Sequence, residues 1–332
     1  MGVEDMEAEE IYSFDSYSCR AYRIGSGDEN IAFVTENHGD EKGPRRVLDE
    51  MFEDGALEYE DLKLTVIEKT NAYASEATRR KTPLDIQKVE ADEHDMNRMY
   101  GKARRTLETE KSIQSLNTTG QLAHQVLDYI DNLDPDLVVD MHTGASATVK
   151  MPQIRYKFRE DYGDVSEKEM RAVAENAGVD IVKTIPEEDA QMIGAVLPKM
   201  GFPTVTVEAG GGVRLGWGTT FDEEDVENYR DIIENILEFR AEGTETDYLP
   251  EEFTSIEKNH APMNVSKAEV DYHFDLGDKV KEGDRVATLS FEDGEVEMAA
   301  LSDGVLETVL AEDSRDNTRH GNRIFNIATR QK

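Results

Sequence analysis

Apolar and polar positions along the first 240 residues follow two alternating patterns. Short apolar runs predict buried strands at residues 31–34, 62–67, 137–141, 179–182 and 204–207, and a strand pair is expected within 11–24. Between the runs, apolar residues recur every three or four positions and predict helices, one beginning near Pro44 and the others at 122–133, 167–176, 187–199 and 222–240. This alternation predicts an α/β fold with a mostly parallel sheet.

Three segments depart from this alternation. Residues 70–105 have weak periodicity and are expected to form long loops. Residues 244–264 are polar, contain Pro250 and Pro262, and are expected to form a linker. Residues 265–332 contain short apolar runs separated by Gly-Asp turns, which predicts an all-β module.

The expected β module carries an internal repeat. Residues 283–289 and 321–327 have similar sequences, which predicts two related halves of a small pseudo-symmetric sandwich. We place the domain boundary within the linker, so that residues 1–255 form the α/β domain and residues 256–332 form the module.

Acidic residues dominate the charge of the chain. Seventy-two aspartates and glutamates against 37 lysines and arginines give a net charge of −35. Self-repulsion of this size destabilises a folded protein in dilute salt, whereas molar salt shortens the screening length to roughly 3 Å. We therefore predict that the protein comes from a halophile. A net acidic surface also argues against nucleic-acid binding.

Composition excludes several other classes of protein. No apolar run approaches the ~18 residues of a membrane span, so no membrane partner is expected. The acidic N-terminus lacks the pattern of a signal peptide, and we expect a cytoplasmic protein. Cys19 is the only cysteine, which excludes an internal disulfide and a cysteine-rich zinc finger.

Three residues with useful chemistry lie just past short apolar strands. These residues are His38, His142 and Glu208. Because ligands bind outside the carboxyl ends of strands in open α/β sheets, we expect the three side chains to converge. Glu41 follows His38 by three residues, a spacing that an acidic chain also produces by chance, so the pair gains weight only from this context.

His38, Glu41 and His142 together form a candidate metal site. Two histidines and a glutamate are the usual ligands of zinc hydrolases that keep one coordination position for water. Asp140 is placed on the same side of its strand as His142, where it can accept the second ring N–H. Glu208 stays outside the ligand set and suits a general base; the alternative is a solvated loop carboxylate.

Basic residues gather in two segments beside the expected site. They are Arg79, Arg80, Lys81, Lys88, Arg98, Lys102, Arg104 and Arg105 in the first, and Lys150, Arg155, Lys157 and Arg159 in the second. Basic clusters in so acidic a chain favour a small anionic substrate, because arginine binds carboxylates bidentately. The alternative is ordinary ion pairing with abundant acidic residues.

Four ordered motifs resemble one known family. They are His-Gly-Asp-Glu at 38–41, Asp-Met-Asn-Arg at 95–98, Asp-Met-His-Thr-Gly at 140–144 and Thr-Val-Glu-Ala-Gly at 206–210. Over roughly residues 30–215 the chain resembles the succinylglutamate desuccinylase/aspartoacylase family, which is related to the zinc carboxypeptidases. The resemblance implies a mixed central sheet flanked by helices, one zinc ion on His38, Glu41 and His142, and Glu208 as the base that activates water.

The resemblance also implies how a substrate is held. Asn97 and Arg98 look like the pair that binds the substrate carboxylate, and either Arg79 or Arg80 looks like the arginine that polarises the scissile carbonyl. The expected activity is deacylation, the hydrolysis of the amide bond of an N-acylated amino acid or a similar small anion. The alternatives are a metallocarboxypeptidase that acts on peptide C-termini and a non-catalytic binding or assembly protein.

The C-terminal module resembles the biotinyl/lipoyl-like barrel-sandwich through residues 276–284. A carrier domain needs a lysine at the hairpin between its halves, but residues 297–300 are Glu-Met-Ala-Ala, and no lysine lies between Lys281 and Lys332. Covalent cofactor attachment is therefore not expected. The module is expected to cap the catalytic cleft or to mediate assembly, which includes a homo-oligomer.

Overall fold

The computed structural model describes most of the chain. The described residues are 8–14, 16–83, 94–109, 111–145, 148–157, 165, 167–184, 191–214, 218–244, 250–262, 267–292, 294–311, 315, 318 and 321–330. Lys88, Arg159 and the first part of the helix predicted at 187–199 lie outside these residues. None of the described helices combines the length and the apolar composition that crossing a membrane requires.

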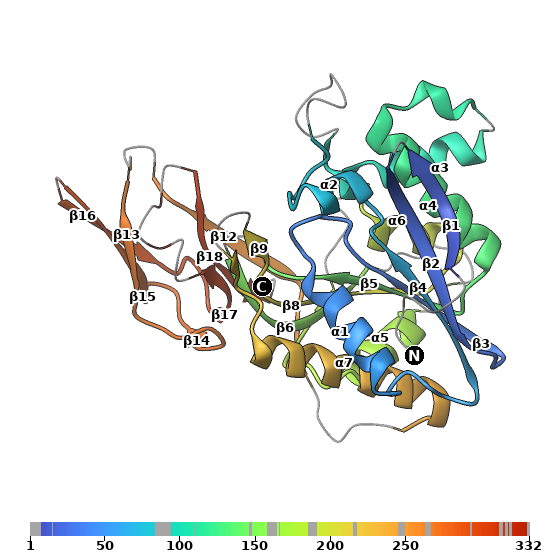
Figure 1. The fold of residues 1–332 in the computed structure, drawn as a ribbon. Helices are drawn as coiled ribbons and strands as arrows, with labels where there is room; N and C mark the ends of the chain where they lie inside the picture. Colours follow the sequence, from blue (N-terminus) through green and yellow to red (C-terminus); the bar gives the residue numbers. More distant parts are fainter. Residues whose placement is uncertain are drawn as a thin grey trace.

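A mixed β-sheet forms the centre of the molecule (Figure 1). Across the sheet its strands are β1 (Ala8–Phe14), β2 (Tyr17–Gly25), β4 (Leu62–Glu68), β3 (Glu29–Val34), β5 (Leu137–His142), β8 (Thr204–Gly210), β6 (Thr148–Tyr156), β7 (Ile181–Thr184) and β11 (Glu251–Phe253). β4, β3, β5 and β8 are parallel neighbours, so their carboxyl ends meet at one edge of the sheet. The strands expected from short apolar runs are confirmed.

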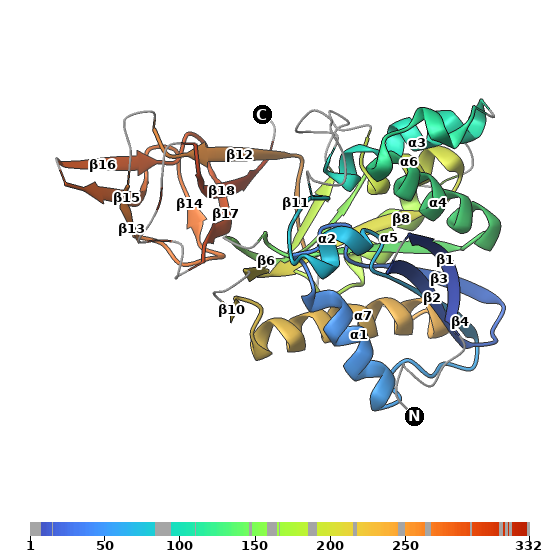
Figure 2. The ribbon, with the colours of Figure 1, turned by 45° about the horizontal axis from the view of Figure 1, so that its top comes forward.

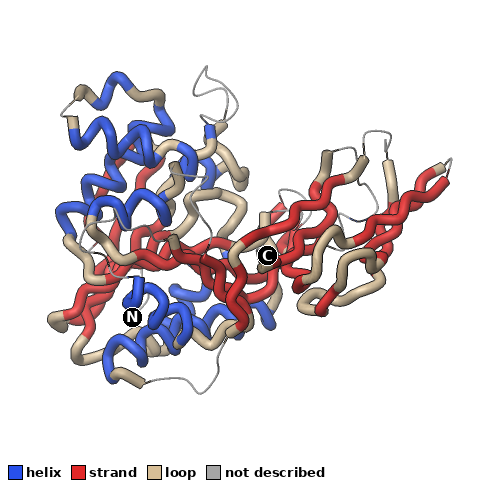
Figure 3. Tube along the Cα trace, turned by 180° about the vertical axis from the view of Figure 1, so that it is seen from behind, coloured by secondary structure: helices blue, strands red, loops and turns tan. Residues whose placement is uncertain are grey.

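Helices cover both faces of this sheet (Figures 2 and 3). One face packs against α1 (Gly43–Glu53), α5 (Glu167–Glu175) and α7 (Glu223–Glu242), whose buried side chains share one hydrophobic cluster. The other face packs against α3 (Tyr100–Glu108), α4 (Thr118–Leu133) and α6 (Ile193–Met200), which share a second cluster. This arrangement confirms the predicted α/β class with a mixed sheet flanked by helices.

Capping residues set the ends of the long helices. The Asn117 side chain accepts the Gly120 N–H at the start of α4, and Asp134 ends that helix in the left-handed region, directly before Pro135. α7 begins with a capping box in which Asp222 and Asp225 accept each other's backbone N–H. Both helices therefore begin and end close to the residues that their patterns predict.

The prediction of long loops over residues 70–105 is wrong in part. α2 (Ala72–Glu76), the 3₁₀ helix η3 (Met96–Arg98) and most of α3 lie within this stretch, and a second 3₁₀ helix, η4 (Ile113–Ser115), follows it. Asn71 caps α2 and Asp95 caps η3 through their side chains. α2, η3 and η4 have only five, three and three residues and are too short to display a helical period in the sequence.

Several further strands differ from expectation. β6 was not predicted, because most of its residues are only partly buried and two, Lys150 and Arg155, are basic, so it shows no apolar run. The expected linker at 244–264 contains β11, which pairs with β7, and β12 (Ser255–His260), which pairs with β18 (Arg323–Thr329). Two small strands, β9 (Val213–Arg214) and β10 (Gly218–Thr219), form a separate pair.

The C-terminal residues form strands, as expected. They are β13 (Glu269–Tyr272), β14 (Lys279–Val280), β15 (Arg285–Phe291), β16 (Gly294–Ala299), β17 (Gly304–Leu310) and β18 (Arg323–Thr329). β13, β15 and β16 form a three-stranded sheet, and a hydrophobic cluster of their own lies between these strands and β17 and β18. β17 also pairs with β6, so this part continues the central sheet. The domain boundary at 255/256 stays a prediction.

The internal repeat has matching positions in the structure. Gly283 and Gly321 both have positive φ, 89° and 77° respectively, and each lies two residues before a strand, β15 or β18. Glycine adopts this conformation without steric cost, which explains why the repeat begins with it.

Candidate active site

The turn after β3 presents the first two site residues. Gly39 lets this turn pass close to α2, since a Cβ at Gly39 would lie 1.9 Å from the backbone carbon of Ala74. Glu36 is left-handed, with φ of 57°, and its buried carboxylate accepts a hydrogen bond from Ser75. The turn is thus held against α2, with His38 and Glu41 directed into the protein.

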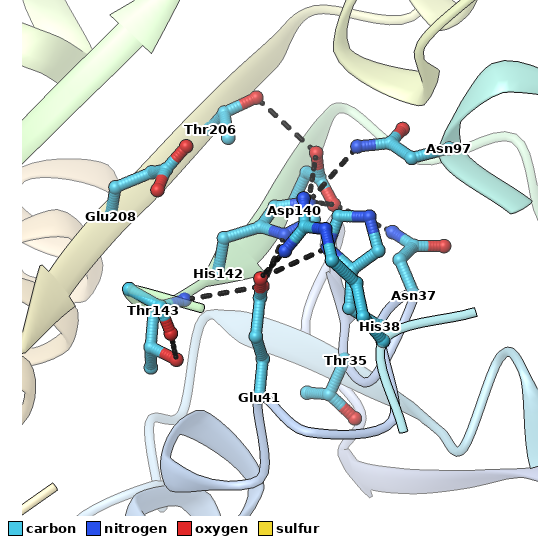
Figure 4. A network of polar contacts seen from close by, with 12 residues as sticks. Thr35, Asn37, His38, Glu41, Asn97, Asp140, His142, Thr143, Thr206 and Glu208 are labelled. Carbon is cyan, nitrogen blue, oxygen red and sulfur yellow. Dashed lines mark hydrogen bonds and ion pairs between the residues drawn. The ribbon is translucent and has the colours of Figure 1, made fainter. Parts of the chain in front are cut away.

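His38, Glu41 and His142 form one buried cluster (Figure 4). The Glu41 carboxylate lies between the two imidazoles, with Oε1 3.0 Å from His38 Nδ1 and Oε2 2.7 Å from His142 Nδ1. One donor atom from each residue lies within 4.8 Å of the others. The structure therefore brings together the three residues that were expected to bind metal.

The outer ring nitrogens each meet an aspartate. His38 Nε2 is 3.1 Å from Asp95 Oδ1, and His142 Nε2 is 3.1 Å from Asp140 Oδ2. Asp140 is in turn held by the Asn37 amide at 2.9 Å. A carboxylate that accepts the N–H of the outer ring nitrogen selects the tautomer in which Nδ1 carries a lone pair, so that Nδ1 can bind a cation together with Glu41.

The charges of this cluster suit a metal ion. Burial alone would raise the pKa of Glu41, but His38, His142 and Arg80 outweigh it and hold that pKa well below its usual value. Burial lowers the pKa of His142, yet Asp140 and Glu41 raise it to about 9. Glu41 therefore offers an ionised carboxylate, and the acidic groups that favour a proton on His142 would equally favour a divalent cation in place of that proton. The donor set therefore fits zinc.

Glu208 lies beside the cluster but is not joined to it. On β8 it stands in register with His142 of β5, so the two side chains share one face of the sheet. Its carboxylate contacts Lys150 through Oε2 and Arg155 through Oε1, the latter at 2.8 Å. Figure 4 shows the side chain on the strand next to His142, with no interaction drawn from it to the cluster.

The two candidate arginines occupy different surroundings. Arg80 Nη1 is 2.6 Å from Glu41 Oε1, and its guanidinium lines the cavity beside the cluster. Arg79 is exposed, and its backbone N–H bonds to Ala74 at the end of α2. The geometry therefore places Arg80, and not Arg79, at the candidate site.

Asn97 and Arg98 also line this cavity. Asn97 is 1 % exposed; its oxygen accepts the Ile193 N–H at 3.0 Å, and its nitrogen lies 3.4 Å from His142 Nε2. This bond to the start of α6 orients the amide toward the cluster. Arg98 is partly exposed at the end of η3, where its side chain reaches the same cavity.

The cavity has a volume of about 320 Å³ and is strongly basic. Its cationic lining residues are Arg80, Arg98, Lys150, Arg155, Lys157, Lys258 and Arg323. Glu41 and Glu208 are its acidic lining residues. In a chain of net charge −35, this excess of positive charge is concentrated where a small anion would bind.

Sequence reasoning missed the C-terminal contribution to this cavity. One side of the cavity is lined by residues from the C-terminal part of the chain. They are Thr254 and Ser255 together with Lys258, Arg323 and Asn326, which come from β12 and β18. No motif marks these residues, because their role depends on pairing between strands that are far apart in sequence. Asp95 belongs to one of the four motifs, but nothing in the sequence indicates its contact with His38.

Comparison with known families fits this geometry. A model of the succinylglutamate desuccinylase/aspartoacylase catalytic domain matches residues 28–240. The chain belongs to this family. The match confirms the resemblance drawn from the four motifs, contains all the candidate site residues and assigns the chain to a family of deacylating hydrolases. A search of curated proteins finds no match.

Solved structures share the family's fold with this chain. The ectoine utilization protein of Ruegeria pomeroyi is 18% identical, with a TM-score of 0.70 over 98% of this chain and 94% of that one. A succinylglutamate desuccinylase of Silicibacter sp. TM1040 is 19% identical, with a TM-score of 0.69 over 99% and 97% of the two chains. Because the identities are low, these structures support the fold alone.

Proposed function

We propose that the chain is a zinc-dependent deacylase that hydrolyses the amide bond of an N-acylated amino acid or a similar small carboxylate. The observation that carries this proposal is the His38–Glu41–His142 cluster, which opens on a basic cavity of about 320 Å³. When bound there, zinc would polarise the scissile carbonyl and make water a better nucleophile near neutral pH. We propose one zinc ion per chain.

The chain's own residues would transfer the proton, stabilise the transition state and bind the substrate. Glu208 would take the proton of the attacking water and pass it to the leaving amine. Arg80 would donate to the oxygen that becomes negative in the tetrahedral transition state. Asn97 and Arg98 would hold the substrate carboxylate, which contributes by positioning the amide bond over the cluster.

The C-terminal strands would complete the binding site. We propose that residues 256–332 form a separate barrel-sandwich module that closes one side of the catalytic cleft, since Lys258, Arg323 and Asn326 line the cavity. A small anionic N-acyl compound remains the proposed partner. A cytoplasmic location, the lack of nucleic-acid and membrane partners and the homo-oligomer stay predictions.

A substrate panel tests the activity. Purified protein in high KCl is incubated with N-acetyl and N-succinyl amino acids, with an N-acylated diamine compound and with a peptide, and release of the amine is measured. Hydrolysis of an N-acyl amino acid supports the proposal, whereas release of the C-terminal residue of the peptide alone would identify a metallocarboxypeptidase.

Two variants test the roles of the residues. Glu208→Gln should keep stoichiometric zinc and lose turnover, because it removes the base and leaves the ligands. His142→Ala should lose zinc in an elemental assay. Full activity of Glu208→Gln would refute the base. Purified wild-type protein that binds no zinc would instead favour a binding or assembly protein.

A further inference from the structure

A series of buried hydrogen bonds leads from His142 to Tyr100. Asp140, which contacts His142 Nε2, is held by two donors, the Asn37 amide at 2.9 Å and the Thr206 hydroxyl at 3.3 Å (Figure 4). The Asn37 oxygen in turn accepts the Tyr100 hydroxyl at 2.5 Å. Tyr100, Asn37, Asp140 and His142 are each at most 3% exposed, so water does not compete for these bonds.

The chemistry of these groups fixes the direction of each hydrogen bond. A carboxylate can only accept, so Asn37 turns its NH₂ group toward Asp140 and its oxygen toward Tyr100. Burial, followed by the charge of Asp140, raises the pKa of Tyr100 well above its ordinary value, so the hydroxyl keeps its proton and donates it. Asp140 is then oriented to accept the Nε2–H of His142, which leaves Nδ1 for a cation.

Thr70 is a second hydroxyl beside the Asn37 oxygen. It lies 3.1 Å from that oxygen but 2.7 Å from the Thr35 carbonyl. Because a hydroxyl has a single proton and 2.7 Å is the usual length of a strong O–H···O bond, the Thr70 proton goes to Thr35. Tyr100 is therefore the donor that sets the orientation of Asn37.

The position of Tyr100 in the fold connects it to the substrate side of the site as well. It is the first residue of α3 and follows η3, whose Asn97 and Arg98 line the cavity, by two positions. Tyr100 thus lies where the turn that would hold the substrate meets the hydrogen bonds that orient His142.

We propose that Tyr100 is a positioning residue for the metal site. Its hydroxyl fixes the Asn37 amide, Asn37 fixes the Asp140 carboxylate, and Asp140 holds the His142 imidazole with Nδ1 toward Glu41. Without the hydroxyl, the amide can rotate until its oxygen faces Asp140, where two acceptors repel each other. This inference rests on the proposed zinc dependence and deepens it, because the effect falls on the affinity for the metal.

Zinc affinity tests this role without turnover. Metal-free wild type and Tyr100→Phe are titrated with zinc against a chromogenic chelator at neutral pH and fixed KCl concentration. Tyr100→Phe removes one oxygen atom and should weaken zinc binding about tenfold, the lower end of the loss when the outer partners of a metal ligand are changed. Equal zinc affinity in the two proteins overturns the proposal.

Tyr272→Phe is the matched control. It removes a hydroxyl that donates to the Ile324 carbonyl at 2.6 Å in the C-terminal strands, so it also loses one protein hydrogen bond. Tyr272→Phe should bind zinc like wild type, whatever its loss of stability in denaturant unfolding. An equal loss of zinc affinity in Tyr272→Phe and Tyr100→Phe would mean a general effect of lower stability and would refute the positioning role.

A double-mutant cycle tests the route through Asn37. Asn37→Leu should weaken zinc binding by about 10–100-fold, because Asp140 loses a donor. Addition of Tyr100→Phe to Asn37→Leu should cause no further loss, since Tyr100 acts through the amide that is already gone. Losses that multiply in the double variant would show that Tyr100 acts by another route and would contradict the proposal.

Failure of this inference is distinct from failure of the proposed function. Wild-type protein that binds no zinc refutes the zinc-dependent deacylase and the positioning role together. If wild type binds zinc and hydrolyses an N-acyl amino acid while Tyr100→Phe binds zinc equally tightly, the deacylase stands and the positioning role alone is refuted.

Discussion

Arg79 and Arg80 show how much two adjacent residues can differ in role. Arg80 contacts the Glu41 carboxylate at 2.6 Å, while Arg79 is exposed. The sequence left both open, because they follow α2 in a stretch with no period that assigns a face. The direction of each side chain depends on the turn that follows α2, in which Thr78 has a left-handed φ of 47°.

Exchange of each arginine for methionine should separate them. Arg80→Met should lower kcat by about 10²–10³-fold, the usual loss when one donor to a developing oxyanion is removed. Arg79→Met should stay within about twofold of wild type, since an exposed residue makes little contribution to an enclosed site. Steady-state kinetics with one N-acyl substrate measures both, and comparable losses in the two variants would contradict the assignment.

Asp95 illustrates a second limit on prediction from sequence. Asp140 was anticipated as a partner of His142 because residues two apart on a strand share a face. Asp95 binds His38 from 57 positions away, and no local period connects them. Local geometry is readable from a sequence, whereas a contact between a turn and a distant 3₁₀ helix depends on the tertiary fold.

The strands that carry the site were the most predictable elements. β3, β5 and β8 are buried along almost their whole length. β3 and β5 are nearly continuous apolar runs and β8 alternates threonine with valine before Glu208, so all three are recognisable as buried strands in the sequence. β6 was missed because it borders the cavity and exchanges apolar residues for Lys150 and Arg155. The basic residues by which β6 lines the cavity also interrupt the apolar run by which a strand is recognised in the sequence.

The turn between β3 and α1 should tolerate no side chain at Gly39. Gly39→Ala would place a Cβ within 2.2 Å of three backbone atoms of α2, which cannot move cheaply. We expect a loss of about 3 kcal/mol in the free energy of unfolding, at the upper end of overpacking costs, and a lower zinc content. Denaturant unfolding and an elemental assay measure the two effects.

A second glycine provides the control for this change. Gly243 caps α7 with φ of 68° and has open space where a Cβ would lie. Gly243→Asn should cost less than about 1 kcal/mol, because asparagine also tolerates the left-handed conformation. If Gly39→Ala is as mild as Gly243→Asn, the close approach to α2 does not shape the site.

One buried ion pair joins the central sheet to the C-terminal strands. Lys183 of β7 and Glu307 of β17 are both 0% exposed and in contact. Glu307 also accepts a hydrogen bond from Asn326 at 3.1 Å, and Asn326 lines the cavity. The pair is therefore adjacent to the C-terminal strands that line the cavity.

Removal of one partner should destabilise the whole molecule. Lys183→Met should cost about 3–5 kcal/mol of unfolding free energy, because it leaves the Glu307 carboxylate buried without its cation. The double variant Lys183→Met/Glu307→Leu should recover most of that loss, since both charges are then gone. Denaturant unfolding at neutral pH measures both, and a double variant no better than the single one would contradict this view.

The same pair makes a prediction for acid stability. Burial would raise the pKa of Glu307, but Lys183 and Arg155 outweigh it and hold that pKa below its ordinary value of 4.5. The stability that Glu307 contributes is therefore complete above about pH 4.5 and is lost as the pH falls further. Between pH 5 and pH 3, wild type should lose more stability than the double variant in parallel unfolding measurements.

The net charge predicts how the molecule responds to salt. With a charge of −35, self-repulsion should lower the melting temperature in dilute buffer, and multimolar KCl should raise it by several degrees. Thermal melts followed by circular dichroism at low and high KCl measure this. An equal or higher melting temperature at low salt would refute adaptation to a saline cell.

Because β17 pairs with β6, residues made last in synthesis complete a site whose other residues are made first. The chain is synthesised from its N-terminus, so His38, Glu41 and His142 leave the ribosome long before Arg323 and Asn326. A nascent chain therefore holds all three proposed metal ligands before the C-terminal residues that line the cavity have been made. Under the proposed function, metal binding can precede substrate selection during biosynthesis, and the cavity is complete only when β18 pairs with β17.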